Sequence, residues 1–281
     1  MIDLHLHLLP AIDDGARDLG VSRAMLARLS DLGYRRVVAT PHLVEPLQDR
    51  YATAVHMALD DVREVAKDYG VAVDLGFEHV LVPGLAERLE AGEASTLAGS
   101  RAVLVELPFV GWPQHAESSL FALQLAGYTP VLAHPERYVA VQQDRELALA
   151  VAERGVVLQL TLASFAGVFG KPVQRTAQDL LRESVERGTP VVLATDAHSD
   201  GQRLVRVDAG LRAINKQFAG DDALVQWAAH DVPAALLSNA TLPAFDASRL
   251  SGAGVSPFRS GPLGAASGLI RKVGRLRSPN E

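Results

Sequence analysis

Two histidines near the N-terminus are the first residues in the chain whose types and spacing suit chemistry. His5 and His7 alternate with leucine in the run Asp3-Leu-His5-Leu-His7. Alternate side chains of a β-strand share one face, so both imidazoles point the same way. Two imidazoles at the end of a strand can hold one metal ion between them. A single histidine in an apolar strand is more often a core residue, but this spacing beside Asp3 favours metal ligands.

The loop after this run contains the sequence Asp13-Asp14-Gly15. Aspartate and glycine are typical of turns and helix caps, and that interpretation remains open for one of the two aspartates. In a parallel barrel the loop lies at the same rim as His7, so at least one carboxylate is expected to reach the metal. Residue types alone do not choose between Asp13 and Asp14.

Further ligand-type side chains follow the ends of later predicted strands. Asp196 and His198 repeat the i, i+2 spacing of the first pair. Barrel enzymes keep their active sites at the carboxyl ends of the strands, and unpaired buried charge is costly. The recurrence therefore predicts a metal site at this rim. The later residues are His42, Glu78, Glu106, His134, Asp196 and His198.

The other histidines and one glutamate receive different interpretations. His79 follows Glu78 and points away from the site if the strand continues. We expect none of the remaining histidines to be a ligand, although one of them, His115, lies near the predicted rim. Glu136 either supports a ligand or forms an ion pair. The remaining histidines are His56, His115 and His230.

Alternating strand and helix patterns predict how these residues are positioned. The strands are short, continuous apolar runs, which indicates a parallel sheet covered on both faces. A closed or nearly closed α/β barrel is the first interpretation, and an open doubly wound sheet the second. The predicted strands are Ile2–His7, Arg36–Thr40, Val71–Phe77, Ala102–Leu107, Thr129–His134, Val156–Thr161 and Pro190–Thr195. The predicted helices are Val21–Leu32, Ala52–Tyr69, Val82–Ala91, Ala116–Ala126, Arg145–Arg154, Pro172–Arg187 and Arg203–Phe218.

Composition excludes several classes of chemistry. The chain has 281 residues and no cysteine, so disulfides, thiolate metal sites and cysteine nucleophiles are all excluded. Any metal must be held by imidazole and carboxylate groups. The formal charge of −6 argues against nucleic-acid binding. The first residues lack the pattern of a signal peptide, and we expect a cytoplasmic protein.

The C-terminal part of the chain differs from the rest. Residues 246–281 are rich in Gly, Pro and Ser and predict a flexible tail after a catalytic barrel over residues 1–245. Residues 247–281 carry six basic side chains and one acid, Glu281. The basic stretch from Leu269 to Arg277 contains interleaved apolar residues and is an alternative candidate for weak contact with a membrane surface.

Together these motifs resemble the polymerase and histidinol phosphatase (PHP) superfamily. They are most similar to its bacterial tyrosine-phosphatase branch, which is associated with capsule and exopolysaccharide synthesis. The similarity extends to about residue 240, and one segment, Leu160 to Ser164, departs from it. The motifs are Asp3-Leu-His5-Leu-His7, Asp13-Asp14-Gly15, Thr40-Pro41-His42, Glu78, Glu106, His134-Pro135-Glu136-Arg137-Tyr138 and Asp196-Ala197-His198.

The resemblance implies a distorted (β/α)7 barrel with three divalent metal ions. Manganese is the first expectation, with iron, zinc, magnesium and cobalt as alternatives. It also implies that Arg137 and Arg203 bind the substrate phosphate. Three divalent cations would outweigh four carboxylates and leave a net charge of about +2, which attracts phosphate. The implied ligands are His5, His7, Asp14, His42, Glu78, Glu106, His134, Asp196 and His198.

The function implied by the resemblance is that of a metal-dependent protein-tyrosine phosphatase. Its partner would be the phosphotyrosyl tail of a membrane-bound tyrosine autokinase. In this hypothesis a metal-bound water of pKa ~7 supplies the hydroxide that attacks phosphorus, without a cysteine nucleophile. The alternatives are a small-molecule phosphatase, such as a histidinol phosphatase, and a non-catalytic metal-binding regulatory module. A homo-oligomer is left open.

Overall fold

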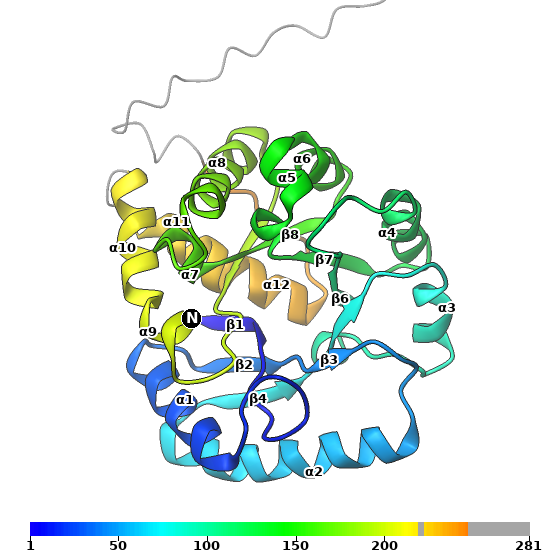
Figure 1. Cartoon of the computed structure of the whole chain (residues 1–281), viewed down its shortest axis with the longest axis vertical. Helices are drawn as coiled ribbons and strands as arrows, with labels where there is room; N and C mark the ends of the chain where they lie inside the picture. The colour runs from blue at the N-terminus through cyan, green and yellow to red at the C-terminus, as the bar shows by residue number, and fades with distance from the viewer. Residues whose placement is uncertain (219–221, 247–281) are drawn as a thin grey trace, which may run out of the picture.

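The computed structural model describes residues 1–218 and 222–246. Parallel strands form its centre, and helices surround them (Figure 1). This arrangement agrees with the predicted α/β class. The tail predicted over residues 246–281 lies outside the described residues except for Asp246, so the division of the chain at residue 245 stays a prediction.

The strands form two sheets in which every pair is parallel. Parallel pairing requires a crossover between neighbours, and the intervening helices provide it. The first sheet has the order β1 (Ile2–Leu6), β2 (Arg36–Ala39), β4 (Ala72–Leu75). The second has the order β3 (His42–Leu43), β5 (Glu78–Val80), β6 (Ala102–Glu106), β7 (Thr129–Ala133), β8 (Val157–Thr161), β9 (Val191–Ala194).

The two sheets meet at two irregular junctions. At the first, β9 reaches β1 through an isolated bridge between Leu6 and Ala197, and His7 N–H donates to the carbonyl of Ala197 over 2.8 Å. At the second, Pro41 separates β2 from β3, because proline has no N–H to continue the ladder. The carbonyl of Pro41 accepts from Glu78 N–H over 3.1 Å. The strands therefore follow a distorted barrel with an interrupted ladder.

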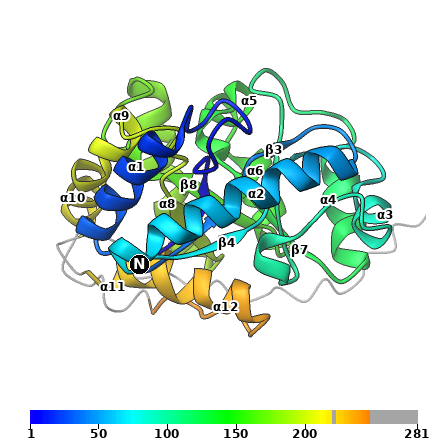
Figure 2. The same ribbon diagram turned by 90° about the horizontal axis from the view of Figure 1, so that it is seen from below.

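Twelve α-helices of the described part pack around the strands. Asp18 caps the first of them by accepting a hydrogen bond from Val21 N–H over 2.9 Å. Helix α12 lies at the end of the barrel opposite the loop that follows β1 (Figure 2). The bounds are α1 Leu19–Asp31, α2 Asp49–Ala66, α3 Leu85–Glu90, α4 Ala116–Leu125, α5 Val139–Gln143, α6 Glu146–Glu153, α7 Leu162–Phe165, α8 Lys171–Arg187, α9 Gln202–Val205, α10 Val207–Gln217, α11 Ala223–Gln226 and α12 Val232–Ser238.

All seven predicted strands are present, with ends shifted by up to two residues. The prediction missed β3 and β5, since strands of two and three residues are too short to show a periodicity. The prediction of a single helix over Arg203–Phe218 was wrong. The backbone at Arg206 leaves helical geometry and separates α9 from α10.

The buried core consists mainly of Leu, Val and Ala from the strands and the inner faces of the helices. Every residue of β1, β8 and β9 is buried. These strands are covered on both faces, as the apolar sequence of β9 predicts, and the polar residues Asp3, His5 and Gln159 of β1 and β8 are buried with them. Among the described helices, none combines the length and the hydropathy that crossing a membrane requires.

Candidate metal centre

Nitrogen and oxygen atoms of nine side chains converge at the carboxyl ends of the strands. They form four overlapping groups, and within each group the potential ligand atoms lie within 4.8 Å of one another. The groups are His7, Asp14, His42 and His198; His5, His7 and Asp196; His5, Glu78 and His134; and His42, Glu78 and Glu106. The structure thus brings together all nine residues that the resemblance implied as ligands.

Glu78 lies at the centre of the cluster and belongs to two of the groups. Its Oε1 is 3.0 Å from Nε2 of His134. Its Oε2 is 3.1 Å from Nε2 of His5 and 3.2 Å from Nδ1 of His42. Glu78 is buried and begins β5 directly after the Gly76-Phe77 interruption. Its two oxygens therefore face different histidines, as expected of a carboxylate that bridges two positions.

His5 and His7 present the same ring nitrogen to the cluster. Their Nε2 atoms are 3.4 Å apart. Nδ1–H of His5 donates to Oε1 of Gln159 over 2.8 Å, and Nδ1–H of His7 donates to Oδ2 of Asp13 over 2.6 Å. In the neutral rings, acceptors of this kind leave the Nε2 lone pairs directed toward a shared position, the usual arrangement around a metal-binding imidazole.

The two adjacent aspartates have different surroundings. Asp13 accepts hydrogen bonds from the N–H groups of Gly15 and His42, over 2.9 and 3.1 Å, in addition to that from His7. Oδ1 of Asp14 lies 3.3 Å from Nε2 of His198 and 3.5 Å from Nε2 of His42. The oxygens of Asp13 are therefore used in hydrogen bonds that orient His7 and the loop, and Asp14 is the candidate metal ligand of the pair.

Charged neighbours lower the pKa values of two buried acids of the cluster, Glu78 and Asp196. Burial raises the pKa of Glu78, but attraction to His5 and hydrogen bonding with His134 hold that pKa well below its usual range. Burial lowers the pKa of His7, but hydrogen bonds with Asp13 and Glu78 outweigh burial and raise it to about 10. Burial and the neighbouring His7 lower the pKa of His198 to about 4. Buried carboxylates of this kind need a cation beside them.

Two of the candidate ligands have a strained backbone. His134 directly follows β7, and Asp196 lies one residue beyond Thr195 at the end of β9; their φ values are 35° and 49°. Residues other than glycine rarely adopt this left-handed region, at a cost of about 1–3 kcal/mol each. Such outliers cluster at functional sites, where the surrounding structure holds a side chain in a required direction.

Two arginines border the cluster on the side of Asp196. Nη1 of Arg137 lies 2.7 Å from Oδ2 of Asp196, and Nη1 of Arg203 lies 2.8 Å from Oδ1. Nη1 of Arg203 also lies 2.7 Å from Nδ1 of His198. Two guanidinium groups beside the same carboxylate can each form charge-assisted hydrogen bonds to an anion that approaches the cluster.

Glu136 and the remaining histidines lie outside the cluster. Glu136 is buried and accepts from Thr161 N–H and Ser164 Oγ–H over 2.9 and 2.8 Å, so it connects the loop after β7 to the end of β8. His79 is buried, and its Nε2–H donates a hydrogen bond to the carbonyl of Ser95. The other three each lie near a carbonyl or carboxylate of the surrounding fold: His56, His115 and His230.

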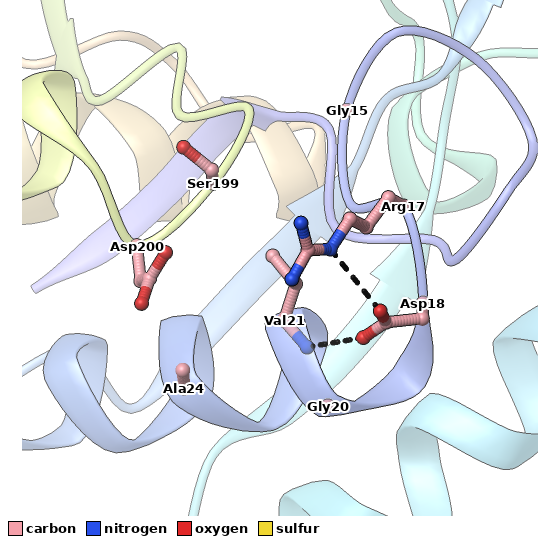
Figure 3. Close-up of a pocket in the computed structure, with 8 residues that line it drawn as sticks. All are labelled: Gly15, Arg17, Asp18, Gly20, Val21, Ala24, Ser199 and Asp200. Carbon is pink, nitrogen blue, oxygen red and sulfur yellow. Dashed lines mark hydrogen bonds and ion pairs between the residues drawn. The ribbon is translucent and has the colours of Figure 1, made fainter.

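Two cavities share Ser199, which directly follows the candidate ligand His198. One, of about 350 Å³, is lined by Val168, Phe169, His198, Ser199, Gln202 and Arg203. The other is about 450 Å³ in volume and lies between the start of α1 and the loop after β9. Figure 3 shows Ser199 and Asp200 across this second cavity from the hydrogen-bonded pair Arg17 and Asp18. The first cavity includes the candidate ligand His198 and Arg203 in its lining, so a substrate can approach the cluster through it.

Sequence analysis missed Gln159 and left the choice of aspartate open. A signal for Gln159 was present, because a glutamine in the middle of the apolar run Val157–Thr161 must find buried hydrogen-bond partners. Its Oε1 accepts from the N–H of His134 over 3.2 Å as well as from His5. No comparable signal distinguishes Asp13 from Asp14, since both are aspartates in the same loop.

The donor set fits divalent metal ions. All candidate atoms are imidazole nitrogens or carboxylate oxygens, which suit Mn, Fe, Zn or Mg rather than thiophilic metals. The Nδ1 atoms of His5 and His7 already have acceptors, so their Nε2 atoms remain for a metal. The geometry supports metal-assisted chemistry on a phosphate ester, with the arginines beside it.

A family model and two curated relatives place this chain among the same group of proteins. Residues 1–237 match the family model described as "Capsular polysaccharide synthesis, CpsB/CapC". The chain is 33% identical over 223 residues to the tyrosine-protein phosphatase YwqE of Bacillus subtilis (strain 168), covering 79% of this chain and 86% of that protein. It is 28% identical over 232 residues to the tyrosine-protein phosphatase CpsB of Streptococcus pneumoniae, covering 79% and 93%.

A solved structure resembles the fold closely. It belongs to a set described as YwqE from Bacillus subtilis and CpsB from Streptococcus pneumoniae, "unique metal-dependent tyrosine phosphatases". The two chains superpose with a TM-score of 0.76 and 31% sequence identity, over 87% of this chain and 97% of that one.

Proposed function

We propose a function for this chain from the premise that it belongs to the capsular polysaccharide synthesis family CpsB/CapC. In this proposal the protein is a metal-dependent phosphatase that removes phosphate from tyrosine residues of proteins, without a cysteine nucleophile. The observation that supports this most directly is the convergence of nine nitrogen and oxygen donors beside two arginines.

The proposed metal ligands are the nine residues of the cluster. Three divalent ions, with manganese as the first expectation, would be shared among the four overlapping groups. When bound, these ions neutralise phosphate charge and increase the acidity of water. The ligands are His5, His7, Asp14, His42, Glu78, Glu106, His134, Asp196 and His198.

The surrounding side chains provide the rest of the proposed mechanism. Arg137 and Arg203 bind the phosphate oxygens and stabilise the charge that develops on them in the transition state. Gln159 and Asp13 hold the rings of His5 and His7 by their Nδ1 atoms. These contacts orient the phosphate relative to the cluster.

The proposed partner is the phosphotyrosyl tail of a membrane-bound tyrosine autokinase, and the proposed location is the cytoplasm. Two observations support the partner. The relatives are named tyrosine-protein phosphatases, and the family model is described by capsular polysaccharide synthesis. A cavity lined by His198 and Arg203 also opens beside the cluster, where a chain segment carrying the phosphorylated residue can approach.

Metal removal and substrate comparison test this function. EDTA treatment followed by gel filtration should abolish hydrolysis of p-nitrophenyl phosphate and of a phosphotyrosyl peptide, and added Mn²⁺ should restore both. Histidinol phosphate serves as the competing substrate. Full activity of the metal-free protein would refute the metal-dependent mechanism, and preference for histidinol phosphate would identify a small-molecule phosphatase. A manganese-loaded protein inert on all three substrates would indicate a regulatory module.

Substituting the arginines tests their part separately. Arg137→Ala and Arg203→Ala should each lower kcat/KM by about 10- to 100-fold, because each removes a charge-assisted contact worth roughly 1.5–3 kcal/mol. The metal content, measured by atomic emission, should remain that of the wild type. Loss of metal together with activity would instead assign the arginines to the support of Asp196.

A further inference from the structure

The guanidinium group of Arg137 lies between two aromatic rings. Its Cζ is 4.7 Å from the centroid of Phe109 and 4.6 Å from the centroid of Phe169. A guanidinium within about 6 Å of a ring centroid is attracted by the negative face of the ring. Arg137 therefore has aromatic partners on two sides in addition to its ion pair with Asp196.

The two phenylalanines come from different loops of the same rim. Phe109 follows β6, and Phe169 lies between α7 and α8. Phe109 is 42% exposed, so its ring is accessible from the rim. Its ring also stacks on His134, with centroids 5.5 Å apart and an interplanar angle of 25°. Phe109 thus contacts both a candidate metal ligand and a candidate phosphate-binding residue.

Phe169 is placed to contact substrate as well as arginine. Cζ of Arg203 is 5.5 Å from its ring centroid, so Phe169 has both arginines as neighbours. It also lines the cavity of about 350 Å³ together with His198 and Arg203. An ester group attached to a phosphate between the two arginines would therefore lie beside the ring of Phe169.

The shape and charge of these groups explain why the side chains are aromatic. A planar guanidinium between two ring faces loses rotational freedom, so its N–H groups keep one direction. A phenylalanine on the cavity wall favours another aromatic ring through offset or edge-to-face contact beyond simple burial. An aliphatic side chain of similar volume provides neither effect.

We propose that Phe109 and Phe169 form an aromatic clamp on Arg137, and that Phe169 makes the site selective for aryl over alkyl phosphate esters. The second part rests on the proposed phosphatase function, whereas the first concerns phosphate binding alone. In this proposal Phe109 is a positioning residue, and Phe169 both positions the arginines and contacts the substrate ring.

Leucine substitutions separate the two parts of the proposal. In the manganese-loaded enzyme, Phe169→Leu should lower the ratio of kcat/KM for phenyl phosphate to that for glycerol 2-phosphate by about tenfold, as expected for loss of an aromatic pair. Phe109→Leu should leave this ratio unchanged. Both variants should weaken the binding of inorganic phosphate by about 3- to 30-fold, the range expected for loss of a cation–π contact. Phosphate binding is measured by isothermal titration calorimetry.

Two further variants serve as controls. Phe169→Tyr retains the ring and should restore the substrate ratio and phosphate affinity to within about twofold of wild type. Phe121→Leu removes a phenylalanine that is 58% exposed on α4, a helix that carries none of the candidate ligands or arginines, and should change neither quantity. Circular dichroism and metal content should match wild type for all four variants.

Three outcomes would overturn the proposal. Equal losses on aryl and alkyl esters in Phe169→Leu would remove the selectivity, and unchanged phosphate affinity in both leucine variants would remove the clamp. Failure of Phe169→Tyr to restore either property would reduce Phe169 to a packing residue. If the wild type hydrolyses neither ester, the proposed function and the selectivity fail, while phosphate calorimetry still decides the clamp.

Discussion

Nδ1 of His7 lies 2.6 Å from Oδ2 of Asp13, so the first of two adjacent aspartates supports an imidazole and the second faces the cluster. The same loop therefore supplies both a candidate ligand and the group that orients one. Asp13 also accepts from the N–H of His42, which connects the loop after β1 to the start of β3. Substitutions of these two neighbours are expected to have different effects.

Asp13→Asn should weaken metal binding without reducing the number of ions bound. The amide oxygen can still accept from His7, but the negative charge that makes the imidazole a better ligand is lost, and the affinity should fall about 10- to 100-fold. Asp14→Asn should instead lower the number of ions per chain at saturation. Atomic emission after dialysis against graded chelator measures both quantities. Equal stoichiometry for the two variants would contradict the division of roles.

Gln159→Leu should leave the ring of His5 and the N–H of His134 without their acceptor. Metal affinity should fall about 10- to 100-fold, and the free energy of unfolding should fall by about 1–3 kcal/mol because buried donors become unpaired. Gln159→Glu keeps an acceptor at the same position and serves as the matched control. Chelator competition and urea denaturation report the two effects, and equal behaviour of both variants would indicate that the acceptor is unimportant.

Gly15→Ala should disrupt the metal centre through a steric clash. A Cβ at residue 15 would meet the carbonyl oxygen of His7 at 2.3 Å and its Cβ at 2.4 Å, so the loop would have to move. Metal content should fall strongly, since Asp13 and Asp14 move with the loop. Gly20→Ala is the control, because its Cβ would meet only Oδ1 of Asp18, at 3.0 Å, and alanine favours the helix. Normal metal content in Gly15→Ala would show that the loop adapts.

His79 should make the metal-free protein less stable in mild acid. Burial lowers the pKa of His79 to about 4, whereas an unfolded histidine titrates near 6.5. As the pH falls below 6.5 the unfolded chain binds a proton that the folded chain does not. The free energy of unfolding should therefore fall by about 2 kcal/mol between pH 7.5 and pH 5 from this residue.

The comparison protein for this effect is His79→Gln, which does not titrate. Both proteins are studied metal-free, so that release of metal ions in acid does not contribute. Urea denaturation at each pH measures the free energy of unfolding. The pH dependence of the wild type should exceed that of the variant by this amount, and parallel curves would contradict the assignment to His79.

Much of the fold and the candidate site follows from local pattern. The alternation of His5 and His7 with leucine sets a shared side-chain face, and the apolar run before Asp196 indicates a strand whose end carries it. A parallel barrel then brings strand ends together without any knowledge of the detailed packing. For this reason ligand-type residues far apart in sequence were predicted to meet.

The supporting residues depend on contacts that sequence does not display. The direction of Asp13 is determined by its hydrogen bonds to His7 and His42, which no spacing in the chain encodes. Similarly, Phe109 and Phe169 are ordinary loop residues until both are seen beside Arg137. The two-residue strand β3 exists only because its partner β5 lies next to it. These features arise from tertiary contacts and therefore require the structure.

The junction between β9 and β1 also determines when the metal centre can form. Asp3 accepts a hydrogen bond from Thr195 at a sequence separation of 192 residues. The first strand therefore cannot complete its contacts until the last strand has folded. Contacts between residues so far apart in sequence are expected to form late in folding, because a long loop must close first. A nascent chain that has not yet emerged past residue 198 has only part of the donor set. The full set of metal ions is therefore expected to bind only after the chain has folded completely. Metal binding then stabilises the folded chain relative to partly folded forms.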